Sequence, residues 1–552
     1  MTKRSPNLAL MFALLVCGTT VAKADFLSFL SYQTLSFQPK SVLTLIVPEM
    51  ATAPTGETLL AACEVGANNV VTLRLWFFNP AGALVAGPTT VTTVGTMAGM
   101  KVGAGPGSFA VAFDVVGNPT DTNGHGIYFR SYTLSGVQIS GPIDTRVNSL
   151  TNLDERLPAV AGYPTATGTG FVFTWVRNGL TPGTPTSGVY ARRFTASGVA
   201  IDVADVRIDA TTVNNINAPQ VATWPNGRFV VSWMDGLPFP ATGTLGSGTG
   251  VFARVMNAAF TFRTGQLTIP VTMLDDQFQP FVACDYNQTF VCAWSSFVPG
   301  GFDAFARRFN DLGVALDATE IDLSSTAATN GHVVTGLSMC ASGDWCATMD
   351  AAGPSAGFFA PRSKFIRLTS NGATASVIED GFLDPATSSE TQLNARVKLD
   401  QFGHASFGFA IDTGTSVGLI GFKALRSMLQ FDSVAPPAGA TVTVYLDSPG
   451  SPSAPYILGC SFGTGPIAVD NRKLPLSPDQ LLLDCLSGVY PTVFTNFVGT
   501  LDAFGGASGA QVVIPNLPIL VGLTFYFAYG VIDPSWPSSV RATSPAASFT
   551  VQ

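Results

Sequence analysis

Carboxylates and amides recur at matching places along this 552-residue chain, each just before or at the start of an apolar segment. They are Asp154, Glu155, Asn217, Asp275, Asp276, Asn330 and Asn394. Two carboxylates that face one cavity can serve a glycosidase as proton donor and as nucleophile or base. If the segments are strands around one channel, these side chains converge at its mouth. We therefore predict a binding site there, with a solvated polar rim as the alternative, because connecting segments are generally polar and exposed.

A second arrangement of oxygen ligands lies in the segment Asp121-Thr122-Asn123-Gly124-His125-Gly126. Asp121 and Asn123 alternate before a glycine, as ligands do at the start of many calcium loops. The bidentate carboxylate that completes an EF-hand is missing, so we predict a polar hairpin loop, with a calcium site as the alternative. The three histidines, at positions 125, 332 and 404, occupy different repeat positions, so we predict neither a catalytic triad nor a shared metal. No catalytic residue is assigned, and calcium is the one cofactor considered.

The cysteine spacing predicts disulfides. The predicted pairs are Cys284 with Cys292, Cys340 with Cys346, and Cys460 with Cys485. The first two pairs each flank one turn symmetrically, and in an oxidising compartment such neighbours can form a bridge across a hairpin. Cys63 then remains as a buried free thiol. Intervals of seven and five residues within those two pairs, with no histidine nearby, do not match the ligand spacing of zinc sites.

Residues 1–24 have the features of a secretory signal peptide. A basic start at residues 3–4 precedes an apolar stretch over 8–16 and the cleavage site Ala22-Lys23-Ala24. We therefore predict an exported protein, secreted or held at the cell surface. The later apolar run over 517–531 is broken by Pro518 and Gly522, so no membrane span is predicted.

Charged residues make up 12% of the chain and hydrophobic residues 46%, with 56 Gly and 37 Pro. Such a chain can build large cores and many turns, which excludes coiled coils, collagen-like fibres and disordered proteins. Removal of the three basic residues of the predicted signal peptide takes the formal net charge from −8 to −11. Basic clusters are absent from the sequence, so nucleic acid is not a predicted partner, and neutral polysaccharides fit such a surface better.

A repeat of about 60 residues organises positions 40–428. It is clearest over 158–209 and in the units that start at Pro219 and Pro280, where Trp175, Trp233 and Trp294 recur at intervals of 58 and 61 residues. Each unit has two alternating strands around a polar turn, then a third and a fourth strand. We count seven units. The predicted fold class is therefore all-β, with a seven-bladed β-propeller over residues 25–428 and two packed sandwiches as the alternative.

Two further features concern the ends of this region. The last repeat lacks an outer strand, which the segment 35–47 would supply and so close the ring. After position 428 the repeat stops, and Pro436-Pro437 marks a boundary. Short and evenly spaced strands over 429–552 predict an immunoglobulin-like β-sandwich.

The repeats carry the patterns P-x-V-A, F-V-V-x-W and G-V-Y-A-R-R-F, most closely in the units at Pro158, Pro219 and Pro280. In these patterns they resemble a family of exported bacterial β-propeller repeat proteins. Residues 440–552 resemble a C-terminal module of unknown function found on secreted proteins of environmental bacteria. The resemblance implies a scaffold or adhesion module without fixed catalytic residues. The recurring pairs Arg192-Arg193 and Arg307-Arg308 on the third strand are interpreted as structural.

These observations together predict an exported, non-catalytic binding or adhesion protein whose loops present a site for a polysaccharide or a surface protein. One alternative is a carbohydrate-active hydrolase or lyase at the channel mouth. Another is a structural component of the cell surface or matrix. Because one fold hosts many functions, the site has to decide between them.

Overall fold

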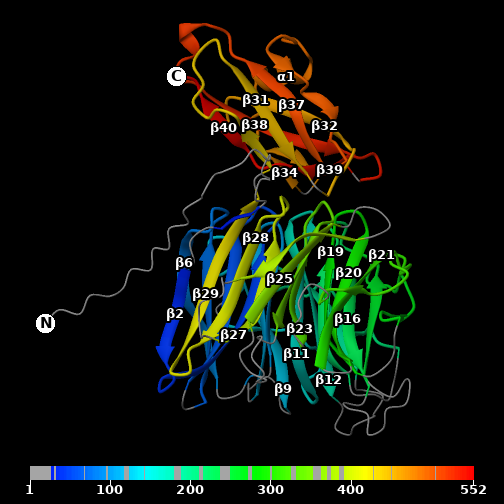
Figure 1. Ribbon diagram of the computed structural model, residues 1–552. Coiled ribbons are helices and arrows are strands. Elements are labelled where there is room, and N and C mark those ends of the chain that lie inside the picture. Colours follow the sequence, from blue (N-terminus) through cyan, green and yellow to red (C-terminus); the bar gives the residue numbers. More distant parts are fainter. Residues whose placement is uncertain are drawn as a thin grey trace, which may run out of the picture.

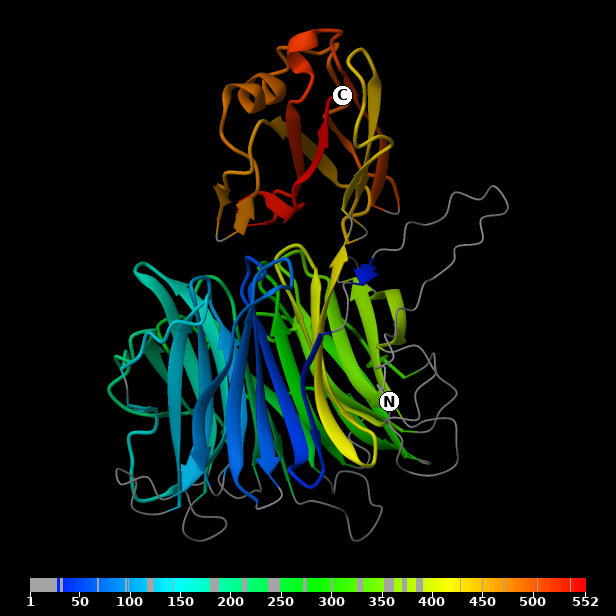
Figure 2. The ribbon, with the colours of Figure 1, turned by 90° about the vertical axis from the view of Figure 1, so that its left-hand side faces the viewer.

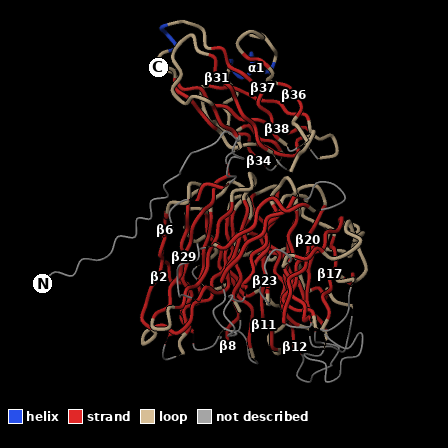
Figure 3. The backbone as a smooth tube through the Cα atoms, viewed as in Figure 1, coloured by secondary structure: helices blue, strands red, loops and turns tan. Residues whose placement is uncertain are grey.

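The computed structural model describes residues 27–29, 33–66, 69–94, 97, 99–116, 124–141, 143–178, 188–210, 216–236, 249–271, 276–298, 301–324, 331–351, 362–369, 375–383, 391–426, 428–448, 450–470, 472–503, 505–536 and 538–552. Within these residues the regular structure is β-strand apart from one α-helix and one short 3-10 helix (Figure 3). Figure 1 shows a ring of sheets with a smaller unit on one end of it. No helix of the described residues is long and apolar enough to cross a bilayer.

Six four-stranded antiparallel sheets, numbered here in chain order, can be followed through the described part of the ring, each built from consecutive segments. The first sheet has β3 (Leu43–Thr52), β4 (Thr58–Gly66), β5 (Val71–Phe78) and β6 (Leu84–Val94), and the second has β7 (Met100–Ala104), β8 (Ser108–Val116), β9 (His125–Thr133) and β10 (Thr145–Arg146). The third has β11 (Asp154–Thr165), β12 (Gly168–Asn178), β13 (Gly188–Thr195) and β14 (Val206–Arg207), and the fourth has β15 (Asn217–Thr223), β16 (Phe229–Asp235), β17 (Gly250–Met256) and β18 (Leu267–Thr268). The fifth has β19 (Gln277–Cys284), β20 (Thr289–Val298), β21 (Gly301–Asn310) and β22 (Ile321–Asp322), and the sixth has β23 (His332–Met339), β24 (Trp345–Ala351), β25 (Arg362–Thr369) and β26 (Ser376–Phe382).

The seventh sheet joins the two ends of the ring-forming segment. Its strands β27 (Thr391–Leu399), β28 (Ala405–Asp412) and β29 (Ser416–Arg426) are completed by β1 (Leu27–Phe29) and β2 (Gln33–Pro39), both paired with β29. The sequence predicted that residues 35–47 would supply this outer strand, and β2 does so. From Leu43 onward, however, the same segment forms β3 of the first sheet.

The first strands of the seven sheets surround a common axis. Each of β3, β7, β11, β15, β19 and β23 contacts the first strand of the next sheet, and β27 contacts β3. The strands approach very closely in places. A methyl group added at Gly103 of β7 would lie 2.7 Å from the carbonyl oxygen of Val160 in β11, so glycine is needed there. The result is a narrow channel lined by seven strands.

The apolar repeats form strands that are covered on both faces. In β12, nine consecutive residues between the exposed ends are buried, because sheets pack on both sides of it. The repeated tryptophans lie in the second strands and stack on an aromatic ring of the third strand. Ring centroids are 6.4 Å apart for Trp175 and Tyr190, 6.4 Å for Trp233 and Phe252, and 6.2 Å for Trp294 and Phe305. The same stack therefore recurs in three of the sheets.

The first arginine of each repeated pair, and the single Arg254 at the same repeat position, join neighbouring sheets. Arg192, Arg254 and Arg307 each donate from Nη1 to the carbonyl that follows the fourth strand of the preceding sheet: Val147 O at 3.0 Å, Ile208 O at 2.8 Å and Ile269 O at 3.1 Å. The second arginine pairs with an acidic residue of its own sheet, and Arg193 also donates to Ala258 O of the next sheet. Arg308 is fully buried and pairs with Asp317 at 2.6 Å, while Arg193 pairs with Asp202 at 2.7 Å. The arginine pairs are therefore structural, as the sequence indicated.

The C-terminal unit packs two antiparallel sheets around one core. One sheet contains β30 (Leu429–Phe431), β31 (Thr441–Asp447), β37 (Gly506–Val513) and β35 (Phe494–Thr495), and the other contains β36 (Val498–Thr500), β32 (Pro455–Ser461), β38 (Thr524–Ile532), β39 (Val540–Thr543) and β40 (Ala547–Thr550). A hairpin of β33 (Ile467–Val469) and β34 (Arg472–Leu474), the helix α1 (Gln480–Leu486) and a 3-10 turn (Pro518–Leu520) complete the unit. Val444 of β31, Leu458 of β32 and Phe527 of β38 meet in the core.

The C-terminal unit stands on the end of the ring where the first strands finish. Phe402, in the turn between β27 and β28, packs against its core. Gln401 Nε2 donates to Lys473 O at 3.2 Å, and Gln401 Oε1 accepts from Lys473 N at 3.3 Å. This end of the channel, here called the domain-side mouth, is thus adjacent to the smaller unit (Figures 1 and 2).

Candidate functional site: the central channel

The opposite end of the channel, where the first strands begin, is here called the loop-side mouth. It contains a cavity of about 200 Å³. The lining residues come from six of the seven first strands or the residues just before them: Gly99–Lys101, Leu157–Pro158, Asn217–Gln220, Gln279–Phe281, Val334–Thr335, Asn394 and Arg396. Amides and cations therefore share this mouth with one aromatic side chain, that of Phe281.

Four of the first strands carry a bulge at the level of the loop-side cavity. Leu157, Ala218, Gln279 and Asn394 have φ of 55°, 47°, 50° and 55°. The pairing of the first with the second strand shifts beside each of them. A left-handed conformation costs a non-glycine residue about 1–2 kcal/mol, and such strain gathers at functional sites. All four residues line the loop-side cavity.

Two carboxylates, the buried Asp114 and the half-buried Asp350, hold two of these bulges in place. Asp114 Oδ2, at the end of β8, accepts from Leu157 N at 3.0 Å, and its Oδ1 accepts from Gly99 N, also at 3.0 Å. Asp350 Oδ2, at the end of β24, accepts from Asn394 N at 2.9 Å. Each carboxylate thus reaches from one sheet to the first strand of the next and fixes the shape of the mouth.

The structure brings together some of the residues predicted for this mouth. Asn217 and Asn394 line the cavity. Asp154, Glu155 and Asp276 are not among its described lining residues, and they bind other parts of the chain. Asp275 and Asn330, and the calcium candidates Asp121 and Asn123, lie outside the described residues. Ligand binding by any of these side chains stays a prediction.

The three carboxylates outside the cavity fasten loops and strands. Asp154 accepts from His125 N at 3.0 Å and from Arg156 Nε at 2.7 Å. Asp276 accepts from Thr249 N at 2.7 Å and from the hydroxyl of Thr249 at 3.0 Å. Each is therefore engaged in local structure.

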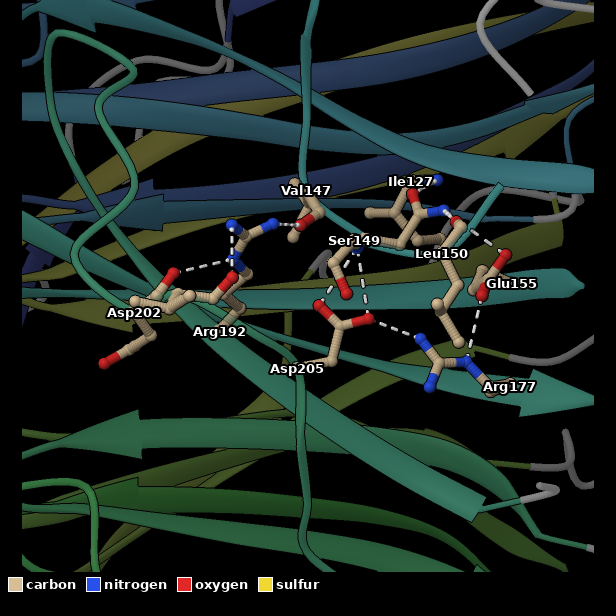
Figure 4. A network of polar contacts seen from close by, with 11 residues as sticks. Ile127, Val147, Ser149, Leu150, Glu155, Arg177, Arg192, Asp202 and Asp205 are labelled. Carbon is tan, nitrogen blue, oxygen red and sulfur yellow. Dashed lines mark hydrogen bonds and ion pairs between the residues drawn. The ribbon is translucent and has the colours of Figure 1, made fainter. Parts of the chain in front are cut away.

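Glu155 belongs to a buried polar network between the second and third sheets (Figure 4). Arg177 Nε donates to Glu155 Oε1 at 2.9 Å, and its Nη2 pairs with Asp205. Asp205 in turn accepts from Ser149 N at 3.0 Å. Burial acts to lower the pKa of Arg177, but Asp205 and Glu155 raise it above its usual value, so the guanidinium stays charged. The network locks a loop and does not face the channel cavity.

Between the two mouths lies a group of charged side chains, here called the waist cluster: Glu49 of β3, Lys101 of β7, and Arg396 and Lys398 of β27. Glu49 Oε1 lies 2.5 Å from Lys101 Nζ and 3.0 Å from Arg396 Nη2. Burial acts to raise the pKa of Glu49, but Arg396 and Lys101 lower it below its usual value, so the carboxylate is ionised. Burial, helped by Lys101 and Arg396 and opposed by Glu49, lowers the pKa of Lys398 to about 8.

The sequence reasoning missed the waist cluster. Its members are far apart along the chain and meet because the first, second and seventh sheets are neighbours in the ring. One signal was present: in a chain with only 12% charged residues, all three cations of the cluster lie in first strands, each with apolar residues on either side. Among the described residues, no group of three or more histidine, cysteine or acidic side chains could hold a metal ion.

The domain-side mouth holds a second cavity of about 200 Å³, to which all seven first strands contribute. Lys398 and Tyr286 are among its lining residues. The guanidinium of Arg472, from the C-terminal unit, lies 5.6 Å from the centroid of the Tyr286 ring. The waist cluster thus lies between two cavities, only one of which adjoins the C-terminal unit.

The predicted disulfides are not formed. Cys284, Cys292, Cys340, Cys346, Cys460 and Cys485 are free thiols, as is Cys63. In the hairpins the register is shifted by two residues from the symmetric pairing: Cys284 is opposite Phe290, and Cys346 is opposite Ser338. Diagonal partners in a sheet are roughly 7–8 Å apart, whereas a disulfide needs Cα atoms about 4.4–6.8 Å apart. Burial also raises the pKa of Cys284 and Cys460, which disfavours the reactive thiolate.

No family model and no curated protein sequence match the chain. Among solved structures, it is similar to a polysaccharide lyase described as an ulvan lyase, with 8% identity over 71% of this chain and 95% of the other, and a TM-score of 0.43. A protein of unknown function from Dyadobacter fermentans has 10% identity over 72% and 99% of the two chains, with a TM-score of 0.38. An α-L-arabinanase from Penicillium chrysogenum has 14% identity over 59% and 94%, with a TM-score of 0.36. Likenesses of this size say nothing about function.

Proposed function

We propose that the chain is an exported, non-catalytic binding protein, in which a seven-bladed β-propeller over residues 25–428 presents a ligand site and an immunoglobulin-like sandwich over 429–552 supports it. The ligand is a polysaccharide, or a protein that carries one, and it enters the loop-side mouth. One observation carries this proposal: strained, non-glycine residues of four first strands line a single cavity that also holds amides, cations and an aromatic ring. Amide side chains beside an aromatic face suit the hydroxyl groups and apolar faces of sugars.

The ionisation and hydrogen bonding of the nearby carboxylates support a binding role. Glu49 is held ionised between two cations, so it is a poor proton donor near neutral pH. Asp114 and Asp350 accept hydrogen bonds from the main chain and maintain the bulges. A glycosidase needs one carboxyl that can donate a proton and a second that faces the same bond.

A lyase is the second candidate, and one observation favours it. Lys398 has a pKa lowered to about 8, chiefly by burial, and it lies two residues from Arg396 on one strand. A lysine whose pKa is near the working pH can act as a general base. Release of unsaturated sugar products by the wild type, and its loss in Lys398→Met, would establish this activity in place of simple binding.

The proposal can be tested by retention on a panel of insoluble polysaccharides, with and without calcium, with assay of the supernatant for released sugar. The variant Asn217→Ala/Asn394→Gly removes two of the four amide side chains that line the cavity, and glycine keeps the positive φ of position 394. Asn257→Ala, in an outer turn, is the matched control, since its side chain bonds only locally, to Thr261. We expect the double variant to lose at least tenfold in retention and the control to behave as the wild type. Equal retention of all three proteins would overturn the loop-side site.

A further inference from the structure

We propose that the waist cluster binds the anionic group of an acidic sugar, a carboxylate or a sulfate, whose ring occupies the loop-side cavity. This inference rests on the proposed function and names the ligand class of the same site. It reverses the expectation, drawn from the acidic overall composition, that neutral sugars fit best. Three properties of the cluster support it: its charge balance, its unused donors and its surroundings.

The charge balance of the waist cluster is positive. Lys101, Arg396 and Lys398 are opposed by the single carboxylate of Glu49, which leaves two positive charges on the channel wall. A buried charge is costly unless it has a partner. The cluster would therefore gain from an anion that enters the channel from outside.

Two donors of the cluster are unused. Among the described residues, no hydrogen bond or ion pair reaches the ammonium group of Lys398, although this residue lines the domain-side cavity. Arg396 gives one Nη atom to Thr335 O and the other to Glu49, but its Nε is buried without a partner. Both residues belong to β27 and are two positions apart, so their side chains leave the same face of that strand.

The surroundings fit a sugar that carries the anion. The Phe281 ring, which lines the loop-side cavity, has Lys101 Nζ 5.7 Å and the Arg396 guanidinium 5.9 Å from its centroid. A sugar ring on this aromatic face would place an acidic substituent next to both cations. The amides of Asn217 and Asn394 are in the same cavity for its hydroxyl groups. A free inorganic anion would use the cations but leave the aromatic ring and the amides unused.

The test compares matched ligands by calorimetry on the full mature chain: a galacturonic acid trisaccharide, its neutral methyl ester, a sulfated disaccharide from chondroitin sulfate, and sodium sulfate at constant ionic strength. Lys398→Met removes a charge that has no partner, so its urea midpoint should equal or exceed that of the wild type. Lys473→Met, in the C-terminal unit, is the charge-matched control, because only the main chain of Lys473 bonds to the ring.

We expect at least one acidic saccharide to bind at least tenfold more tightly than the neutral ester. Lys398→Met should lose about tenfold in affinity for it and none for the ester, which is the usual effect of one charge-assisted contact. Glu49→Gln should strengthen acidic binding, because it removes the opposing charge. Lys473→Met should leave all affinities unchanged.

The outcomes separate this inference from the proposed function. Equal affinity for acidic and neutral sugars, or unchanged acidic binding in Lys398→Met, would overturn the waist site and leave the loop-side site intact. Sulfate binding that depends on Lys398, without binding of any saccharide, would refute the sugar ligand and the proposed function and leave an inorganic anion site. Absence of binding by all four probes would refute both.

Discussion

The adjacent arginines of β21 allow a quantitative test of the energetics of the ring. Arg307 is half-buried and donates to two carbonyls, Asp317 O at 3.0 Å and Ile269 O at 3.1 Å. Arg308 is fully buried, and its guanidinium donates to both carboxylate oxygens of Asp317 at 2.6–3.1 Å. Methionine at either position keeps most of the apolar stem and removes the charge.

The expected costs differ because the partners differ. Arg307→Met loses two hydrogen bonds to neutral main-chain carbonyls, at about 1 kcal/mol each, or about 2 kcal/mol in all. Arg308→Met leaves the Asp317 carboxylate buried without its partner, which costs about 3–5 kcal/mol. The difference of about 2 kcal/mol corresponds to roughly a 30-fold difference in the unfolding equilibrium constant. The double variant Arg308→Met/Asp317→Asn should recover at least about 1 kcal/mol, because no buried charge remains.

Urea unfolding followed by tryptophan fluorescence measures these costs, since six of the seven tryptophans belong to the ring and only Trp536 to the C-terminal unit. Arg193→Met serves as an intermediate case, because the Arg193 and Asp202 side chains are each 12% exposed. The reasoning is refuted if Arg307→Met destabilises as much as Arg308→Met, or if the second substitution recovers nothing.

Three further outcomes are expected. Burial raises the pKa of Asp285 to about 7 despite hydrogen bonds from main-chain amides. Between about pH 4 and 7 the folded chain therefore holds a proton on Asp285 that the unfolded chain releases. The free energy of unfolding should fall as pH rises through that window. Asp285→Asn should flatten this slope, measured as urea midpoints at about pH 5 and about pH 8; an unchanged slope contradicts it. Gly103→Ala should lower the melting temperature of the ring, measured by calorimetry, because its new methyl group would press on Val160 O. A melting temperature that does not fall would show that the two strands can move apart freely. Phe402→Ala should speed proteolytic cleavage between β29 and β30, as the ring would lose its contact with the C-terminal core; cleavage at the wild-type rate argues against that anchor.

Local features of the sequence predicted the sheets well, because each repeat completes its own four-stranded sheet. Around Trp175, and again around Trp233, the alternating apolar and polar residues of one repeat all belong to one sheet. The turns that join the strands of that sheet belong to the same repeat. The bulges of the first strands were not predicted, although Pro158, Pro219 and Pro280 follow three of them.

The features that depend on distant segments were not predictable in this way. Glu49 and Arg396 meet only because the seventh sheet lies beside the first. The hairpin register that separates Cys284 from Cys292 is set by the turn, and a shift of two residues leaves the pattern of buried faces unchanged. Sequence symmetry about a turn therefore could not fix the cysteine geometry.

The pairing of β2 with β29 has a consequence for how the ring assembles. Gln33 meets Gly421 in this pairing, so the contact encloses almost the whole ring-forming segment. Closing a flexible loop of that length costs about 5 kcal/mol of chain entropy, and the cost is repaid only when the intervening sheets have compacted and brought the ends together. The seventh sheet should therefore be completed late in folding, after the other six. Under mechanical load, a pull on β2 should peel this strand away first and leave an open stack of sheets.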